Sequence, residues 1–314
     1  MNATRDPLPA PSEATGDFHD GQDACVHRYL NHVRLLLSFV KPHIDMTFVF
    51  VGVVGSLLAW NGARHLPFLR FLLVAGSVAL LSAGAECWTN IHDRDIDAMM
   101  PRTARRPLVT GQITVVEATC SGTVLTSAGL VLAAVLGAIP FLFLALALIN
   151  NVFIYSILTK RTTPWSVVLG SLVAPFTLWA GYAAVRLPIE PSAWLLGGMA
   201  GVWVFVHIWV IALRYKDDYA AAGVPMAPLV WSRAQITAAL AASSLTMGVL
   251  ATGAIVTLGG PASLWAGVSV AAISAIILVL AVLAPRRRVL ARPLIRAITI
   301  YLIIVLGVAL GCAL

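Results

Sequence analysis

The chain has 314 residues, of which 59% are hydrophobic and only 11% are charged, and its formal net charge is +7. Soluble globular domains carry about 25% charged residues, so this composition excludes a soluble protein and indicates an integral membrane protein. The basic residues are scattered between apolar runs, and four widely spaced cysteines form no metal or disulfide pattern. The positive charge therefore does not indicate a nucleic-acid binder.

The first 40 residues are acidic and rich in proline, and they lack the apolar core of a signal peptide. Such a segment cannot bury enough apolar surface to offset the entropy lost on folding. We expect residues 1–40 to form a disordered cytosolic tail and residues 41–314 to form one membrane domain.

Apolar runs long enough to cross a bilayer as a helix, about 20 residues each, recur nine times after this tail. None of them alternates apolar and polar residues as a membrane β-strand would. The sequence therefore predicts an all-α membrane protein with about nine transmembrane helices. The predicted spans are His43–Trp60, Leu66–Trp88, Ala118–Ile139, Pro140–Leu158, Pro164–Val185, Ser192–Leu213, Ile236–Leu258, Ala262–Ala284 and Pro293–Ala313.

The basic residues indicate how the chain is oriented in its membrane. With the N-terminus inside, 18 of the 21 Lys and Arg residues fall in the inside segments. Because loops rich in Lys and Arg stay in the cytoplasm, we expect a cytosolic N-terminus and an outside C-terminus. We take the membrane to be a bacterial inner membrane.

The second predicted span leads into the most densely charged stretch of the chain, ECWTNIHDRDIDAMMPRTARRPLVTGQ. If the helix continues past the membrane, Asn90, Asp93 and Asp97 share one face, at spacing i, i+3, i+7, and Asp95 points elsewhere. Carboxylates one turn apart repel each other unless a cation lies between them. Oxygen ligands suit Mg²⁺, so this face is a candidate metal site. Glu86 extends the face inward, where we favour a structural hydrogen bond over a role as proton acceptor.

Four arginines surround these carboxylates, and a guanidinium group can bind two phosphate oxygens at once. They are Arg94, Arg102, Arg105 and Arg106. Carboxylates, a cation and arginines together favour a diphosphate ester as ligand. The alternative is a solvated loop whose charges pair with one another and attract lipid headgroups.

A second acidic segment, HIWVIALRYKDDY, follows the sixth span on the same side of the membrane and contains Lys216, Asp217 and Asp218. Two acidic clusters on one face can hold a diphosphate with two metal ions between them. His207 lies within the span, where an ionisable residue faces a cavity or bonds to a neighbouring helix.

Two further segments place lysines at the cytosolic membrane face. Asn151 and Tyr155 share a face of the fourth span, which ends at Lys160 and Arg161, and Lys41 precedes the first span. These lysines are candidate phosphate ligands, or else anchors that reach from the helix ends to the headgroups.

These motifs resemble those of the UbiA superfamily of intramembrane prenyltransferases, and within it the haem O synthase (protohaem IX farnesyltransferase) family. The resemblance runs from Lys41 to about Arg296. Three segments carry it: DRDIDAMMPRTARRPLVTG (93–111), YSILTKRTTP (155–164) and HIWVIALRYKDDYAAAGVPMAP (207–228). Thr89 stands where this family has its leading Asn, and the run TTPWSVVLG after Arg161 also departs from the family pattern.

The resemblance implies nine helices around a central cavity, with Mg²⁺ held on an allylic diphosphate by two acidic motifs. It implies metal ligation by Asp93, Asp97, Asp217 and Asp218, and catalytic roles for Asp93, Asp97, Asp218, Asn90 and Tyr155. The candidate contacts to the diphosphate or the acceptor are Lys41, Thr89, Arg94, Arg102, Arg106, Lys160, Arg161, His207 and Lys216.

We therefore predict Mg²⁺-dependent transfer of a farnesyl group from its diphosphate to haem b in the bilayer, which makes haem O. Alternatives are prenylation of an aromatic or quinone precursor, or of another hydrophobic acceptor, and cyclisation of the prenyl chain. A secondary transporter is an alternative of another class. It is disfavoured because the acidic residues lie at one membrane face, whereas transporter sites lie near the midplane.

Overall fold

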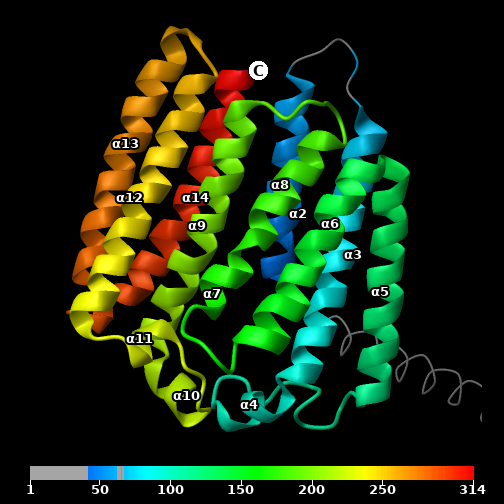
Figure 1. Cartoon of the computed structure of the whole chain (residues 1–314), viewed down its shortest axis with the longest axis vertical. Coiled ribbons are helices and arrows are strands. Elements are labelled where there is room, and N and C mark those ends of the chain that lie inside the picture. Colours follow the sequence, from blue (N-terminus) through cyan, green and yellow to red (C-terminus); the bar gives the residue numbers. More distant parts are fainter. Residues whose placement is uncertain (1–41, 62–64, 66) are drawn as a thin grey trace, which may run out of the picture.

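The computed structural model describes residues 42–61, 65 and 67–314, without the side chains of residues 42–45. This part of the chain consists of helices joined by turns and contains no strand (Figure 1). The fold is therefore all-α, as the sequence predicts. The predicted tail and Lys41 lie outside the described residues.

Nine helical passes make up the bundle within the described part of the chain. Eight have the length and hydropathy of a membrane span, and the first provides a shorter apolar helix, Met46–Trp60. The passes are α2 (Pro42–Trp60), α3 (Phe68–His92), α5 (Val115–Leu136), α6 (Ala138–Ile149) with η1 (Asn150–Thr159), α7 (Ser166–Leu169) with η2 (Gly170–Leu172) and α8 (Val173–Ala183), α9 (Pro191–Arg214), α12 (Arg233–Thr257), α13 (Gly260–Leu283), and η3 (Arg288–Leu290) with α14 (Ala291–Ala313).

Three short helices lie together at one end of this bundle: α4 (Arg94–Met99), α10 (Lys216–Ala221) and α11 (Ala227–Val230). The C-terminus lies at the opposite end (Figure 1). Helices α12, α13 and α14 form one side of the molecule and α2, α3, α5, α6 and α8 the other. Helix α9 packs against α8 on one side and against α12 and α14 on the other, so it joins the two halves.

Helices α2 and α8 approach each other closely through glycines. A Cβ atom at Gly181 would lie 1.9 Å from the Gly52 carbonyl oxygen, and one at Gly55 would lie 2.1 Å from the Leu178 carbonyl oxygen. The Ser56 hydroxyl donates a hydrogen bond of 2.9 Å to the Gly181 carbonyl. Small residues and cross-helix hydrogen bonds are the usual means of helix association in lipid, where apolar surface alone gives no driving force.

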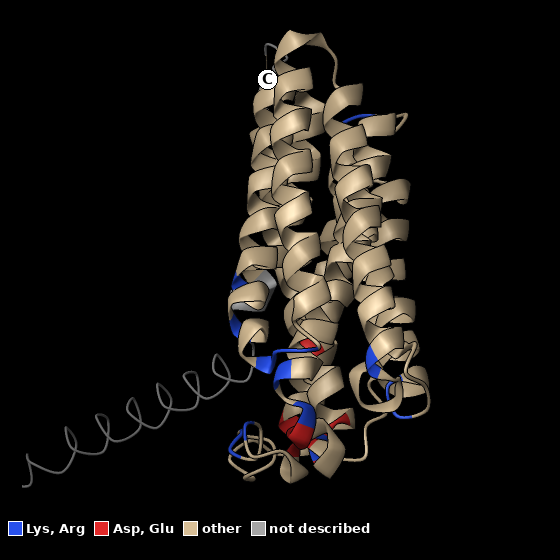
Figure 2. Ribbon diagram, turned by 90° about the vertical axis from the view of Figure 1, so that its left-hand side faces the viewer, with Lys and Arg blue, Asp and Glu red and all other residues tan. Residues whose placement is uncertain are grey.

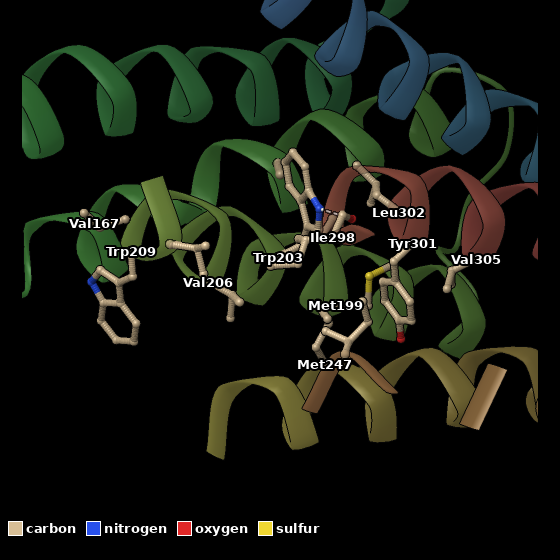
Figure 3. Packing of buried hydrophobic residues seen from close by; sticks show 14 of the residues in the cluster. Val167, Met199, Trp203, Val206, Trp209, Met247, Ile298, Tyr301, Leu302 and Val305 are labelled. Atoms are coloured by element: carbon tan, nitrogen blue, oxygen red, sulfur yellow. Dashed lines mark hydrogen bonds between the residues drawn. The ribbon is translucent and has the colours of Figure 1, made fainter. Parts of the chain in front are cut away.

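The core around α9 is built from large apolar side chains. Figure 3 shows Met199 of α9 beside Tyr301 of α14 and Met247 of α12, and Trp203 of α9 facing Ile298 of α14. The Trp203 indole nitrogen donates a hydrogen bond of 2.9 Å to the Ile298 carbonyl. This contact satisfies a buried polar group and fixes α9 against α14.

Candidate active site

Charged residues gather at the end of the bundle that carries the short helices (Figure 2). Two connections supply the acidic ones: the segment from α3 to α5 and the segment from α9 to α11. The η1 helix ends at the same place and brings Lys160 and Arg161.

The first acidic motif forms a buried face, as its helical spacing predicts. Asn90, Asp93 and Asp97 have 4%, 5% and 5% of their surface exposed. The helix is interrupted at Asp93, whose φ and ψ of −89° and 1° separate α3 from α4. Backbone hydrogen bonds from Asp93 to Thr89 and from Asp97 to Asp93 continue across the break, so the three side chains keep nearly helical positions.

Asp93 forms a salt bridge with Lys160, the residue that follows η1, through its Oδ2 atom. Burial alone lowers the pKa of the Lys160 ammonium, but the adjacent Asp93 carboxylate outweighs this effect and raises the pKa. The other carboxylate oxygen of Asp93, Oδ1, is buried and has no hydrogen-bond partner among the described residues. A buried carboxylate oxygen without a donor is costly unless a ligand or ion completes it.

Arg106 binds the other two members of this face. Its Nη1 donates to Asp97 Oδ2 and, at 3.1 Å, to Asn90 Oδ1. The chain returns to this place because the residues after α4 wind into successive turns. The buried Thr103 hydroxyl fixes the first of these turns with a 2.9 Å hydrogen bond to the Asp97 carbonyl.

Asp95 lies away from the buried face, and 65% of its side chain is exposed. Both of its oxygens accept hydrogen bonds of 2.6 Å from Arg161, which also donates to the His92 carbonyl. The hydrogen bonds from Arg161 lower the pKa of Asp95 to about 2. Arg161, a candidate ligand of the diphosphate, therefore fastens the end of the fourth pass to the break between α3 and α4.

Thr89 and Asn90 differ in what their side chains reach. The Thr89 hydroxyl donates a 3.1 Å hydrogen bond to the Glu86 carbonyl of its own helix. Asn90, one residue later, faces Arg106 and Asp97. Glu86 is buried on the same helix, with 8% of its surface exposed. The family motif that this chain resembles has an Asn at the position of Thr89. Here the Asn side chain lies one residue later, at position 90, on the buried face.

Arg102 joins the first acidic segment to the second. Its Nε atom lies 3.9 Å from Asp218 Oδ2, and its Nη2 donates a 3.1 Å hydrogen bond to the Tyr219 hydroxyl. The guanidinium carbon is 5.4 Å from the ring centres of both Tyr215 and Tyr219. Contacts of this kind add electrostatic attraction to the ion pair and hold α10 against the turns after α4.

The structure does not gather the four predicted metal ligands into one cluster. Asp217 is exposed, and its Oδ2 atom lies 3.4 Å from Nη1 of Arg288, the first residue of η3. Among the described residues, no three His, Cys, Asp or Glu side chains lie close enough to share a metal ion. The two acidic segments meet instead through Arg102, which contacts both Asp218 and Tyr219.

Tyr155 lies within η1, a stretch of π-helix, with its ring 5.6 Å from the Lys160 ammonium. A Cβ atom at Gly170 would come within 2.6 Å of the Tyr155 side chain, so the glycine makes room for this ring. One turn earlier, Asn151 borders a narrow cleft that also touches Ser82 and Ala85 of α3.

This cleft is too small, as it stands, to be the central cavity that the sequence predicts. It has a volume of about 30 Å³ and is lined mainly by apolar side chains of α2, α3, α6 and α8. Such a volume holds a water or two, so a prenyl chain would have to displace side chains or separate helices to enter. A larger hollow of about 360 Å³ lies between α12 and α13, but none of its lining residues is charged.

The other predicted site residues make fewer contacts with the charged residues of the candidate active site. His207 stacks on Trp203 at 5.0 Å, and its Nδ1 is buried without a hydrogen-bond partner among the described residues. Arg94 is exposed and Lys216 partly exposed, and neither forms an ion pair within the described chain.

Three residues with clear roles in the network were not singled out from the sequence: Thr103, Tyr219 and Arg288. The spacing of Tyr215 and Tyr219, four apart around two aspartates, could have indicated a shared aromatic face. Nothing in the sequence pairs Arg288 with Asp217, which is 71 residues away.

The chain is similar to known proteins in both its sequence and its fold. Residues 48–303 match the model of the UbiA prenyltransferase family. The chain is 40% identical over 198 residues to the protoheme IX farnesyltransferase of Thermoplasma volcanium, covering 63% of this chain and 69% of that protein. It is 37% identical over 248 residues to the protoheme IX farnesyltransferase of Frankia casuarinae, covering 76% and 83%.

Two solved structures have the same fold. One is a UbiA homolog from Archaeoglobus fulgidus bound to GPP and Mg²⁺, with a TM-score of 0.67 at 16% identity and coverage of 88% and 99%. The other is a digeranylgeranylglyceryl phosphate synthase, with a TM-score of 0.69 at 18% identity and coverage of 90% and 99%.

Proposed function

This chain is a multi-pass membrane enzyme of the UbiA prenyltransferase family, and from that membership we propose that it transfers a farnesyl group from farnesyl diphosphate to haem b. The product would be haem O. The curated relatives with 32–40% identity are named protoheme IX farnesyltransferases, which supports haem as the acceptor. We further propose that residues 41–314 form the catalytic domain and residues 1–40 a cytosolic tail.

The observation that carries this proposal is a buried set of carboxylates, each held by a cation, beside an apolar cleft. Asp93 binds Lys160 and Asp97 binds Arg106, and both carboxylates are 95% buried. Buried ion pairs of this kind contribute little net stability, because desolvation offsets their attraction. Their presence at the mouth of a membrane protein favours a functional role.

The donor set fits Mg²⁺. Asp93 has a buried oxygen with no partner within the described chain, and the other candidate ligand atoms, on Asp97 and Asp218, are also carboxylate oxygens. We propose that Asp93 and Asp97 hold the ion from one side and Asp218 from the other. Asp217 is the weakest member of the predicted set, because it is exposed and paired with Arg288. When bound, the metal would neutralise negative charge on the diphosphate.

We propose that the basic residues exchange partners when the substrate binds. Lys160 and Arg106 would leave the carboxylates of Asp93 and Asp97 and donate to the diphosphate oxygens. Arg102 would do the same from Asp218. Negative charge collects on these oxygens as the bond to the allylic carbon breaks, so donors already held at this position lower the barrier.

The acceptor would react where water is excluded. The vinyl group of haem b would form a carbon–carbon bond with the allylic cation, and water would then add to the resulting cation and lose a proton. Tyr155, under the Lys160 ammonium, lies between the diphosphate site and the cleft. We propose that His207, with its free Nδ1, contacts the acceptor from α9. Arg94, Arg161, Lys216, Thr89 and Lys41 remain proposed outer contacts.

We also propose that the protein lies in a bacterial inner membrane. The N-terminus and both acidic segments would face the cytosol, and the C-terminus would lie outside. This orientation follows from the excess of basic residues on the side of the acidic segments.

The test is to incubate the purified chain with haem b, farnesyl diphosphate and Mg²⁺ and to look for the mass of haem O. Removal of Mg²⁺ with a chelator should abolish the product, and adding it back should restore it. Prenylated quinone or phenol precursors in place of haem O would move the proposal to the aromatic-acceptor branch of the family.

A pair of neighbouring aspartates provides a matched control. Asp93→Asn should lower kcat/KM by at least about a thousandfold, because it removes a metal ligand and the partner of Lys160. Asp95→Asn should change kcat/KM by less than about threefold, because an exposed ion pair is worth little. Full activity of the Asp93 variant would remove the metal assignment.

A further inference from the structure

A strongly basic segment connects α13 to α14 and meets the second acidic segment of the candidate active site through Arg288. It carries five arginines within eleven residues: Arg286, Arg287, Arg288, Arg292 and Arg296. All five are exposed. Only Arg288 has an ion-pair partner within the described chain, and that partner is Asp217, whose side chain is 89% exposed.

The chain has no means of neutralising this segment from its own C-terminal part. No Asp or Glu follows Asp218 anywhere in the sequence. Four of the five guanidinium groups therefore need an anion from outside the described protein, or remain solvated as free charges.

The position of the segment matches the boundary between headgroups and acyl chains. It lies at the same end of the bundle as α10, because Arg288 reaches Asp217 there. Two apolar side chains beside the arginines are exposed, Leu283 at 37% and Val289 at 76%. Exposed apolar residues interleaved with arginines suit a surface that meets lipid, where the apolar groups enter the bilayer edge and the guanidinium groups meet phosphates.

We propose that residues 283–296 form a binding site for the headgroups of anionic phospholipids. Guanidinium groups bind phosphate oxygens in bidentate pairs, and basic clusters next to a membrane helix attract anionic lipid within a Debye length. Arg292 and Arg296 lie one turn apart on α14 and offer one such pair. Arg286 and Arg287 offer a second one from the preceding turn.

Arg288 links this surface to the second acidic segment. Its contact with Asp217 joins the lipid-binding surface to α10, where the neighbouring Asp218 contacts Arg102. A phosphate that attracts Arg288 would compete with Asp217 for it. Headgroup binding would thereby weaken the contact between Arg288 and Asp217 of α10. The lipid site itself needs no substrate and is independent of the proposed prenyl transfer.

The experiment counts lipids bound to the purified full chain by native mass spectrometry. Phosphatidylglycerol and phosphatidylcholine of equal chain length are titrated in detergent. We expect about fivefold or greater retention of phosphatidylglycerol over phosphatidylcholine. The variants Arg292→Gln with Arg296→Gln, and Arg286→Gln with Arg287→Gln, should each lose most of that preference. Their exposed side chains have no ion-pair partner among the described residues to lose, so melting temperatures in phosphatidylcholine should stay at the wild-type value.

The matched control removes the same charge at the same end of the molecule. Arg94 and Arg105 are exposed and form no ion pair among the described residues, so Arg94→Gln with Arg105→Gln should keep the lipid preference. Equal retention of the two lipids, or equal loss in control and test variants, would overturn the proposal. Binding of soluble glycerol phosphate as tight as that of the lipid would also overturn it, because the ligand would then be a free phosphate ester.

Discussion

Thr89 and Asn90 are adjacent, yet only one of them reaches the buried charges. Asn90 accepts from Arg106, whereas the Thr89 hydroxyl is bonded to its own helix. A hydrogen bond to a charged group is worth about 1.5–3 kcal/mol, so Asn90→Ala should lower kcat by roughly 10- to 100-fold. Thr89→Ala should lower it by less than about threefold, since it removes a local backbone contact and an outer contact to the substrate rather than a contact to the buried charges. Steady-state prenyl transfer by the two variants measures the difference.

The two substitutions control for each other, because both shorten a polar side chain on the same turn of α3. Melting temperatures of both variants show whether a loss of activity reflects unfolding. A larger loss in the Thr89 variant than in the Asn90 variant would assign the polar position of the family motif to Thr89, against the contacts described above.

The sequence was sufficient to predict which residues share the buried face, and insufficient to predict their partners. The spacing of Asn90, Asp93 and Asp97 follows from helix geometry alone. The pairing of Asp97 with Arg106 depends on the path of the turns fixed by Thr103. The pairing of Asp93 with Lys160 depends on how two distant helices pack. Neither path nor packing is encoded in local spacing.

At the scale of the element, the end of the fourth pass has unusual hydrogen bonding. The Lys160 amide donates to the Tyr155 carbonyl, five residues earlier, at 2.9 Å. The Thr159 hydroxyl donates to the Ile154 carbonyl at 2.6 Å, again five residues earlier. A π-helical turn is wider than an α-helical one and occurs frequently at functional sites. Here it sets the direction in which Lys160 leaves the helix toward Asp93.

Thr159→Val keeps the shape of the side chain and removes the hydroxyl that caps this turn. If the turn positions Lys160, the variant should lower kcat by about tenfold, the effect of one lost hydrogen bond in the site. Thr159→Ser restores the hydroxyl and should recover most of the activity. A general loss of packing would instead leave Thr159→Ser, which lacks the methyl group, more impaired than Thr159→Val.

The sequence predicts the fourth pass over Pro140–Leu158, and the structure has it from Ala138 to Thr159. Hydropathy gives the extent of such a helix because the bilayer fixes the length of an apolar run. It does not give the hydrogen-bond type, since the run NNVFIYSILT contains no Gly or Pro to mark the change. No Gly or Pro marks the break between α3 and α4 at Asp93 either, so the sequence predicts a continuous helix there.

For the molecule as a whole, hydropathy predicted the nine passes, because the bilayer rather than tertiary contacts sets the length of an apolar run. The basic residues predict the direction of these passes, and that direction stays a prediction. The link from Arg288 to Asp217 and the link from Arg102 to Asp218 join elements far apart in the chain. Such links follow from the assembled bundle and were not predicted.

The direction of the passes can be tested with fusions at the two ends of the bundle. The C-terminus lies opposite α4 and α10 (Figure 1). Segments rich in Lys and Arg resist translocation, so the end that carries α4, α10 and the arginines between α13 and α14 should stay in the cytosol. Alkaline phosphatase, which is active only outside the cytosol, should be active after Leu314 and inactive after Gly223. A fluorescent protein that folds only in the cytosol should give the reverse pattern. Activity of the phosphatase at Gly223 would invert the proposed orientation and place both acidic segments outside, away from a cytosolic supply of farnesyl diphosphate.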